Sequence, residues 1–148
     1  MNQQTMDVLF SSTKEDWATP DDLYEKYNSI YHFDIDLAAS QENTKHPVFF
    51  SKEQDSLKQD WHKYGKCGWL NPPYGRRMLL WIKKCYEESL NGFTAVVLLP
   101  ARTDVKWFHQ FIYKKKNVEV EFLRGRLQFK EAKFKAPFPS MVVIFRPI

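Results

Sequence analysis

The apolar run FTAVVLL at 93–99 is the sequence feature that most limits how the chain can fold. An extended segment that is apolar at nearly every position must be buried on both of its faces. Such strands lie inside sheets that carry helices on both sides. FDIDLAAS at 33–40 and KCGWL at 66–70 have the apolar patterns of two further strands. We therefore expect three central strands in a layered fold.

Helical patterns stand between and before these strands. Apolar residues recur at helical spacing over 78–85 and again over 107–112. Thr19 stands where an N-cap belongs and Pro20 at the first helical position, so we expect another helix to begin there. The alternation of strands and helices predicts an α/β fold, a three-layer sandwich with a mostly parallel central sheet.

The C-terminal third of the chain has a different pattern. VEVEFL at 118–123 and MVVIFRP at 141–147 have the composition of strands, and a polar, Lys-rich segment joins them. They predict a C-terminal antiparallel strand pair. A chain of 148 residues is large enough for one compact domain, and we expect a single domain over 1–148.

The composition excludes several classes of protein. No stretch approaches the roughly 20 apolar residues that cross a bilayer, so we expect no membrane partner. The N-terminus lacks the basic start and apolar core of a signal peptide, which predicts a cytoplasmic location. Cys67 and Cys85 have no Cys or His neighbours at ligand spacing, so we expect buried thiols and no metal. The net charge of +4 favours polyanionic partners only weakly.

The sequence NPPY at 71–74 directly follows the strand expected at 66–70. In open α/β sheets, ligands bind beyond the carboxyl ends of the strands. Asp36 and Arg102 lie at the ends of the other two expected strands. The pattern therefore places Asp36, Asn71 and Arg102 at one edge of the sheet.

The residue types of NPPY indicate a chemistry for this edge. Pro72 and Pro73 restrict the backbone and hold the side chain of Asn71 in one orientation. The Asn71 side chain and a neighbouring backbone carbonyl can accept both hydrogens of an exocyclic NH₂ group, while the Tyr74 ring stacks on the attached heterocycle. The loop thus predicts a site that orients a weakly nucleophilic amine.

The wider sequence resembles the small phage-type DNA N6-adenine methyltransferases of the Dam family. The resemblance spans most of the chain in order and spacing, through the segments DWATPDDLY, FDIDLAAS, DSLKQDW, WLNPPYG, LLPARTDVKWFH, GRLQF and APFPSMVVIF. It implies a Rossmann-like class I methyltransferase fold, S-adenosylmethionine as methyl donor and adenine N6 in DNA as acceptor. No separate target-recognition domain is expected.

The resemblance also implies where the cofactor binds. It places the cofactor against the segment around Thr19 and Pro20, the turn around Asp36, and Asp55 at the end that holds the cofactor's adenine. The glycine-rich signature of the wider superfamily is replaced by LAAS, whose small residues still let the backbone approach a ligand. The expected cofactor-binding residues are Trp17, Thr19, Pro20, Asp36, Ala38, Ala39 and Asp55.

The candidate DNA-binding residues are basic and lie mostly in the segment GRLQFKEAKFKAP. Side chains of this type contact phosphates without reading the sequence. The candidates are Arg102, Arg124, Arg126, Lys130, Lys133 and Lys135.

The sequence leaves other acceptors open. RNA adenine and the glutamine side chain of a protein present the same planar NH₂ group, and a catalytically degenerate nucleic-acid-binding module is a further alternative. Transfer to DNA adenine is the function that the motif and the resemblance favour.

Overall fold

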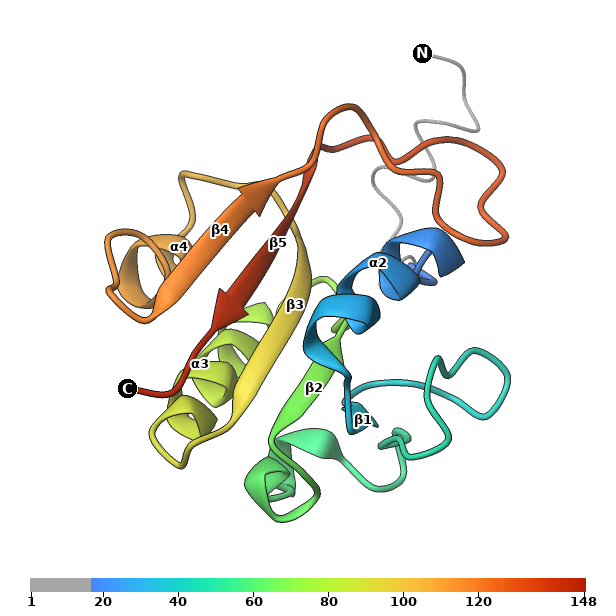
Figure 1. Ribbon diagram of the computed structural model, residues 1–148. Coiled ribbons are helices and arrows are strands. Elements are labelled where there is room, and N and C mark those ends of the chain that lie inside the picture. Colours follow the sequence, from blue (N-terminus) through green and yellow to red (C-terminus); the bar gives the residue numbers. More distant parts are fainter. Residues whose placement is uncertain (1–16) are drawn as a thin grey trace.

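The computed structural model describes residues 17–148, which form a five-stranded sheet with helices on both faces (Figure 1). The order of the strands across the sheet is β1-β2-β3-β5-β4. The strands are β1 (Ile35–Asp36), β2 (Cys67–Leu70), β3 (Thr94–Pro100), β4 (Val118–Phe122) and β5 (Ser140–Phe145). The helices are α2 (Asp21–Tyr31), α3 (Met78–Ser89) and α4 (Lys106–Phe111), with short 3₁₀ helices η1 (Ser56–Lys58) and η2 (Trp61–Lys63).

The middle of the sheet is β3, as the run at 93–99 predicts. Residues 95–100 are all buried, and β5 beside it is buried along its whole length. On one face, Tyr24 and Tyr27 of α2 pack against Trp69 of β2. On the other face lie α3 and α4 (Figure 1). No helix within residues 17–148 is long and apolar enough to span a membrane.

The sheet is mixed, which corrects the expectation of a mostly parallel one. The pairs β1–β2 and β2–β3 are parallel, whereas β3–β5 and β4–β5 are antiparallel. The antiparallel pair predicted at the C-terminal end is present, and β5 inserts between β3 and β4. The reason is the long connection over 123–139, which lets the chain reverse and return beside β3 instead of crossing over through a helix.

The first strand is short and lies at an edge, whereas the sequence predicts a central strand. Its outer side pairs with a later segment, because the Asp36 amide donates to the Val48 carbonyl and the Phe50 amide donates to the Asp36 carbonyl. The Asp36 carboxylate then accepts the amide of Ala38, a side-chain turn that competes with strand extension. The segment at 48–50 therefore covers the edge that β1 would otherwise leave open.

Helix α2 begins one residue later than the sequence predicts. Pro20 is the N-cap residue in an extended conformation, and no side-chain cap is present. The Thr19 hydroxyl, expected as the cap, instead accepts hydrogen bonds from the Trp69 indole and the Asn71 amide. Thr19 therefore connects the entry of α2 to β2 and to the loop that follows β2.

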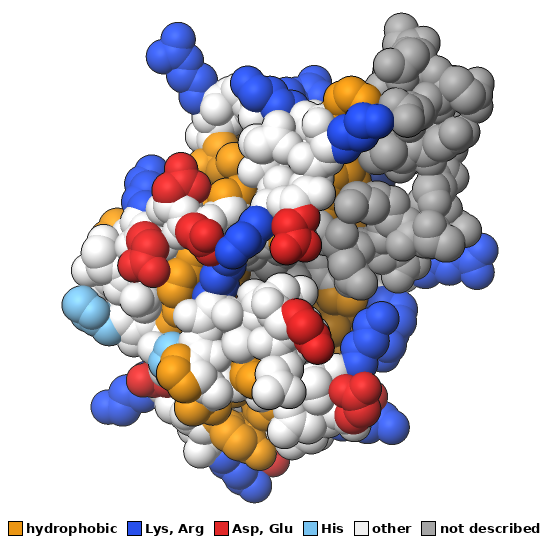
Figure 2. Space-filling model, turned by 90° about the vertical axis from the view of Figure 1, so that its right-hand side faces the viewer, with side chains coloured by type: hydrophobic (Ala, Val, Ile, Leu, Met, Phe, Trp, Pro, Cys, Tyr) orange, Lys and Arg blue, Asp and Glu red, His pale blue; other side chains and the backbone are white. Residues whose placement is uncertain are grey.

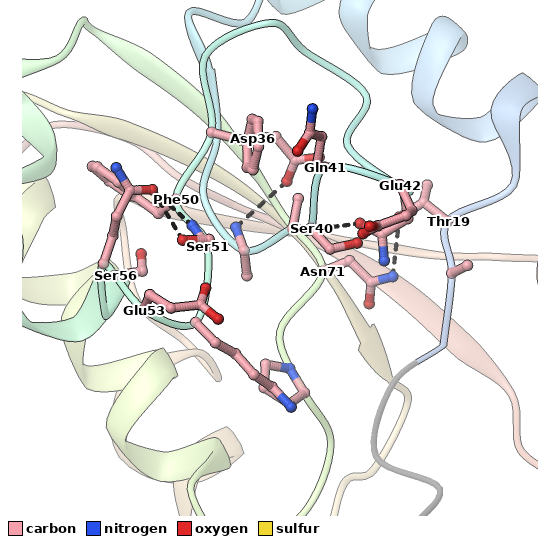
Figure 3. A pocket seen from close by; sticks show the side chains of 18 of the residues that line it. Thr19, Asp36, Ser40, Gln41, Glu42, Phe50, Ser51, Glu53, Ser56 and Asn71 are labelled. Atoms are coloured by element: carbon pink, nitrogen blue, oxygen red, sulfur yellow. Dashed lines mark hydrogen bonds between the residues drawn. The ribbon is translucent and has the colours of Figure 1, made fainter.

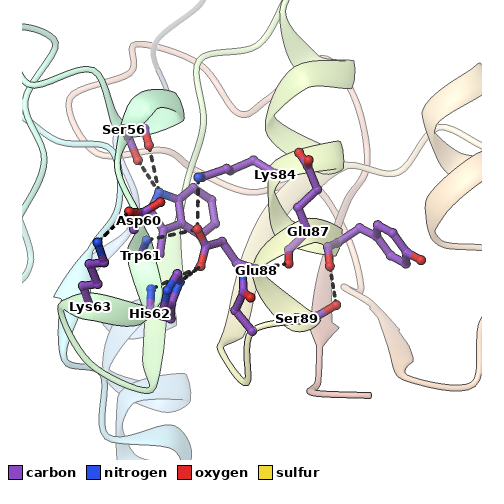
Figure 4. A network of polar contacts seen from close by, with 11 residues as sticks. Ser56, Asp60, Trp61, His62, Lys63, Lys84, Glu87, Glu88 and Ser89 are labelled. Atoms are coloured by element: carbon purple, nitrogen blue, oxygen red, sulfur yellow. Dashed lines mark hydrogen bonds and ion pairs between the residues drawn. The ribbon is translucent and has the colours of Figure 1, made fainter.

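A buried carboxylate joins α3 to the segment before β2 (Figure 4). Glu88 is 2% exposed, and its carboxylate accepts the amides of Trp61 and His62 at 3.1 and 3.2 Å. The His62 ring lies 2.8 Å away and the Lys84 ammonium 3.0 Å away. Burial raises the pKa of Glu88, but the hydrogen bonds from His62 and Lys84 outweigh it, so the pKa lies below its ordinary value.

We expect Glu88→Gln to lower the free energy of unfolding by about 1.5–3 kcal/mol at neutral pH, because donors that face an ionised carboxylate lose their partner. Ionised Glu88 stabilises the fold fully above its ordinary pKa of 4.5, and this contribution is lost as the pH falls through the lower folded-state pKa. The difference between wild type and variant should therefore shrink in acid. Urea unfolding followed by tryptophan fluorescence measures it.

The exposed neighbour Glu87 provides the control. Glu87→Gln should leave the free energy of unfolding unchanged at both acid and neutral pH. An equal loss in the two variants would mean that the network around Glu88 does not hold α3 to η2.

Candidate active site

A pocket of about 950 Å³ opens at the carboxyl ends of β1 and β2. Figure 3 shows Asn71 and Thr19 together on one side of it, and Phe50, Ser51 and Ser56 on the other. The two sides come from segments far apart in the sequence that the sheet edge brings together. The pocket lies where open α/β sheets bind their ligands.

Most of the residues predicted for the cofactor line this pocket. Two residues of NPPY, Asn71 and Pro73, line it as well. Pro20, Pro72 and Tyr74 are not on its wall, nor are the six basic candidates. The predicted cofactor residues that do line it are Trp17, Thr19, Asp36, Ala38, Ala39 and Asp55.

The Asn71 side chain is fixed at one end and unpaired at the other. Its Nδ2 donates to the Trp17 carbonyl and, at 3.0 Å, to the Thr19 hydroxyl. Its Oδ1 is buried and has no hydrogen-bond partner among residues 17–148. Because Pro72 and Pro73 have no amide hydrogen, neither of the next two residues can donate to this oxygen. The Asn71 side chain is therefore held in place by its NH₂ end, and its Oδ1 is an acceptor that is left for a ligand.

Unpaired polar atoms gather at this edge of the sheet. Within residues 17–148, the buried side-chain atoms that lack a partner are Asn71 Oδ1, Trp81 Nε1 and Ser140 Oγ. Asn71 follows β2, Trp81 lies in the first turn of α3, and Ser140 pairs with the last residue of β3. An unsatisfied buried group costs about 1–3 kcal/mol. Such groups at one edge are typical of a ligand site.

Asp36 lies on the pocket wall but also organises the loop behind it. The side chain is 4% exposed, and its two oxygens accept the amides of Lys45 at 3.0 Å and Ala38 at 3.4 Å. Burial raises the pKa of Asp36 to about 6, against the lowering effect of these amides. Its carboxylate is therefore ionised at neutral pH and protonated in mild acid.

Asp34, two residues earlier, has a purely structural place. Its Oδ2 accepts the amides of Lys66 and Cys67 at 2.8 and 3.2 Å. It does not line the pocket. Asp34 and Asp36 are two residues apart, yet Asp34 ties β1 to the start of β2 whereas Asp36 lies on the pocket wall.

The Tyr74 ring is packed inside the protein. It is 9% exposed, its hydroxyl donates to the Leu98 carbonyl at 3.3 Å, and burial raises its pKa above the ordinary value. Phe138 packs edge-on against it, with the ring centroids 5.7 Å apart. The ring therefore lies beside the pocket, under residues of the segment at 123–139.

An aromatic cluster joins that segment to the pocket. Trp17 lines the pocket and packs against Phe129 and Phe138, each with a centroid distance of 5.2 Å. Figure 1 shows the segment arching from the end of β4 toward the start of α2. The C-terminal hairpin connection thus covers the same edge that holds NPPY.

The basic candidates lie outside the pocket and are exposed. Lys and Arg side chains lie at the upper end of Figure 2, the end that the segment at 123–139 occupies in Figure 1. Lys130 is engaged within the fold, because its ammonium pairs with Asp21 at 3.2 Å and its amide donates to the Ala18 carbonyl. Arg102, Arg124, Arg126 and Lys135 have no ion pair among residues 17–148.

Sequence reasoning missed much of the pocket wall. The segment at 49–54 lines it because it pairs with β1, a long-range contact without a local sequence signal. Arg77 and Trp81 line it at the start of α3. Both residues lie shortly after NPPY in the sequence, and this position could have indicated them. The helix that follows a strand begins at the edge of the sheet where that strand ends.

Known proteins match this chain over most of its length. The family model for DNA N-6-adenine-methyltransferase (Dam) matches residues 7–148. The DNA N-6-adenine-methyltransferase of Haemophilus phage HP1 (strain HP1c1) is 32% identical over 144 residues, which cover 92% of this chain and 81% of that protein. The protein of the same name from Escherichia phage T1 is 38% identical over 93 residues, which cover 62% of this chain and 38% of that protein. The chain belongs to the DNA N-6-adenine-methyltransferase (Dam) family.

Proposed function

We propose that this protein transfers a methyl group from S-adenosylmethionine to N6 of adenine in DNA. The observation that carries the proposal is the unpaired Asn71 Oδ1 beside a pocket of about 950 Å³, in a chain of the Dam family. A buried acceptor without a partner is complementary to a ligand that brings an N–H donor. The exocyclic amine of adenine is such a donor.

The residues of NPPY have distinct roles in this proposal. The Asn71 side chain and the Pro72 carbonyl each accept one hydrogen of the N6 amine, which leaves its lone pair directed at the methyl group. The Tyr74 ring stacks on the base. Because N6 is not accessible in a stacked duplex, the adenine is flipped out, at a cost of a few kcal/mol that contacts in the site offset. When bound, S-adenosylmethionine would supply an electrophilic methyl group. The N6 nitrogen would form the new N–C bond as the S–C bond breaks, S-adenosylhomocysteine would leave, and the extra proton on N6 would pass to solvent.

The rest of the pocket suits the cofactor. Asp36 and Asp55 offer carboxylate acceptors on its wall, and Ala38 and Ala39 leave room for a ligand close to the backbone. Trp17 offers an aromatic face at the same wall. We propose that residues 1–148 act as one methyltransferase domain, with DNA held by the basic residues of the segment at 123–139 and by Arg102.

We expect Asn71→Ala to lower the rate of methyl transfer roughly 10²- to 10³-fold while the affinity for S-adenosylhomocysteine is kept, because the lost interaction acts on the reacting amine. Transfer of tritiated methyl groups to DNA under single-turnover conditions measures this. Asn91→Ala, in the exposed turn after α3, is the matched control and should react at the wild-type rate.

The same assay with RNA and with a glutamine-bearing protein tests the other acceptors. Labelling of either one in preference to DNA would overturn the proposed substrate. A near-normal rate for Asn71→Ala on DNA would contradict the role given to the NPPY loop.

We expect the affinity for S-adenosylhomocysteine to rise between about pH 5 and about pH 7, because the pKa of Asp36 is raised to about 6 and its ionised carboxylate is the better acceptor. Asp36→Asn should bind more weakly at neutral pH and lose this rise. Calorimetric titration of the two proteins across this range measures the effect. Asp34→Asn is the control, since Asp34 lies away from the pocket, and the pH profile of its affinity should match that of wild type. A pH rise that persists in Asp36→Asn would assign it to another group.

We expect replacement of Lys133 and Lys135 by Ala to flatten the salt dependence of DNA binding. Each lost phosphate contact should lower the slope of log affinity against log salt by about 0.9 in magnitude. Fluorescence anisotropy at several salt concentrations measures the slope, and cofactor affinity should not change. Lys115 and Lys116, which are exposed and follow α4, form the control pair. Helix α4 lies on the opposite face of the sheet from α2 (Figure 1). An unchanged slope in the first variant and a reduced one in the control would place DNA on the α4 side.

A further inference from the structure

Thr19 and the Trp17 carbonyl hold the amide end of the Asn71 side chain. We propose that Thr19 is a positioning residue that decides which end of this side chain faces the substrate. The inference rests on the proposed function and assigns Thr19 a role apart from any contact with the cofactor. Three observations support the inference. Asn71 Nδ2 donates a 3.0 Å hydrogen bond to Thr19 Oγ1, and the Trp69 indole donates one of 3.3 Å to the same oxygen. Asn71 Oδ1 has no partner among residues 17–148.

The partners of Asn71 permit one orientation of its amide. The Trp17 carbonyl can only accept, so the group facing it must be the NH₂ end. The second hydrogen of that NH₂ goes to Thr19 Oγ1. A side chain turned by half a rotation would set Oδ1 against the Trp17 carbonyl, two acceptors facing each other. Oδ1 is therefore directed away from both anchors.

Trp69 fixes the role of the Thr19 hydroxyl as an acceptor. The indole N–H of Trp69 can only donate, and it takes one lone pair of Thr19 Oγ1. Asn71 Nδ2 takes the other. Thr19 is 6% exposed and Trp69 is fully buried, so little water reaches these bonds. The relay from Trp69 through Thr19 to Asn71 therefore runs from the buried sheet to the wall of the pocket.

The orientation of the amide has a chemical consequence. With Oδ1 as the unpaired end of a fixed group, the site accepts a substrate that presents an N–H donor and disfavours one that presents a carbonyl oxygen at the same position. The relay thus selects a base with an exocyclic amine. The segment before α2 takes part in the reaction through Asn71, although Thr19 touches neither the reacting amine nor the methyl group.

The test compares Thr19→Val, which keeps the shape and removes the hydroxyl, with Thr19→Ser, which keeps the hydroxyl. We expect kcat for DNA methylation to fall about tenfold in Thr19→Val, because the Asn71 side chain loses one of the two hydrogen bonds that hold it. The affinity for S-adenosylhomocysteine should stay the same, and Thr19→Ser should restore kcat. In an Asn71→Ala background, Thr19→Val should have no further effect, because both changes act through one group.

Other outcomes overturn the inference. A lower affinity for S-adenosylhomocysteine with normal kcat would make Thr19 a cofactor contact. Independent losses of rate that multiply in the double variant would show that Thr19 does not act through Asn71. If the wild-type chain methylates neither DNA nor RNA, the proposed function fails instead. Whether Thr19 holds the Asn71 amide is then tested by a measurement that needs no turnover.

That measurement is the side-chain amide spectrum of ¹⁵N-labelled protein, in which the Asn71 signals are identified by their loss in Asn71→Ala. In wild type and Thr19→Ser, both hydrogens of the Asn71 amide should be protected from exchange with solvent. In Thr19→Val, one should lose its protection while the melting curve still shows a folded protein. Equal protection in all three proteins would show that Thr19 does not hold the amide.

Discussion

The burial of β3 on both faces is the constraint on which the rest of the structure depends. Its residues from 95 to 100 are buried, so helices must cover both sides of the sheet. Polar groups are then confined to the ends of the strands, where the chain leaves the core. At the carboxyl ends of β1 and β2 this arrangement leaves a pocket whose walls come from separate loops. The site is thus a consequence of how the core is closed.

The polar atoms at this edge are less well satisfied than those elsewhere in the described part of the fold. Elsewhere the buried carboxylate of Glu88 is satisfied by two amides and two cationic or ring nitrogens. At the edge, Asn71 Oδ1 and Trp81 Nε1 are buried and lack a partner in the part of the chain that the structure describes. The proline pair contributes to this state, because it provides a rigid loop without amide donors that would bind Asn71. An unused acceptor in a rigid setting is what selectivity for an amine requires.

The sequence alone predicts the parts of this arrangement that depend on local pattern. The strand at 93–99, the helix over 78–85 and the C-terminal antiparallel pair follow from apolar periodicity, and the place of NPPY follows from the end of a strand. Contacts between distant segments are not predictable in this way. Asp36 pairs with Val48 and Phe50 on the outer side of β1, which is a short edge strand. The local sequence contains no pattern that predicts this pairing. Thr19 was predicted as a helix cap, because a cap and an acceptor for a distant side chain have the same local sequence.

The position of Tyr74 shows how the same long-range packing acts on the proposed chemistry. Stacking on a base requires a free ring face, yet Phe138 packs against Tyr74 and also against Trp17 on the pocket wall. Phe138 belongs to the segment at 123–139, which also carries Arg124, Arg126 and Lys135. Under the proposed function, the segment that contacts DNA phosphates is therefore the one that covers the stacking ring. Under that proposal, the DNA contacts and the cover of Tyr74 both come from one connection of the chain.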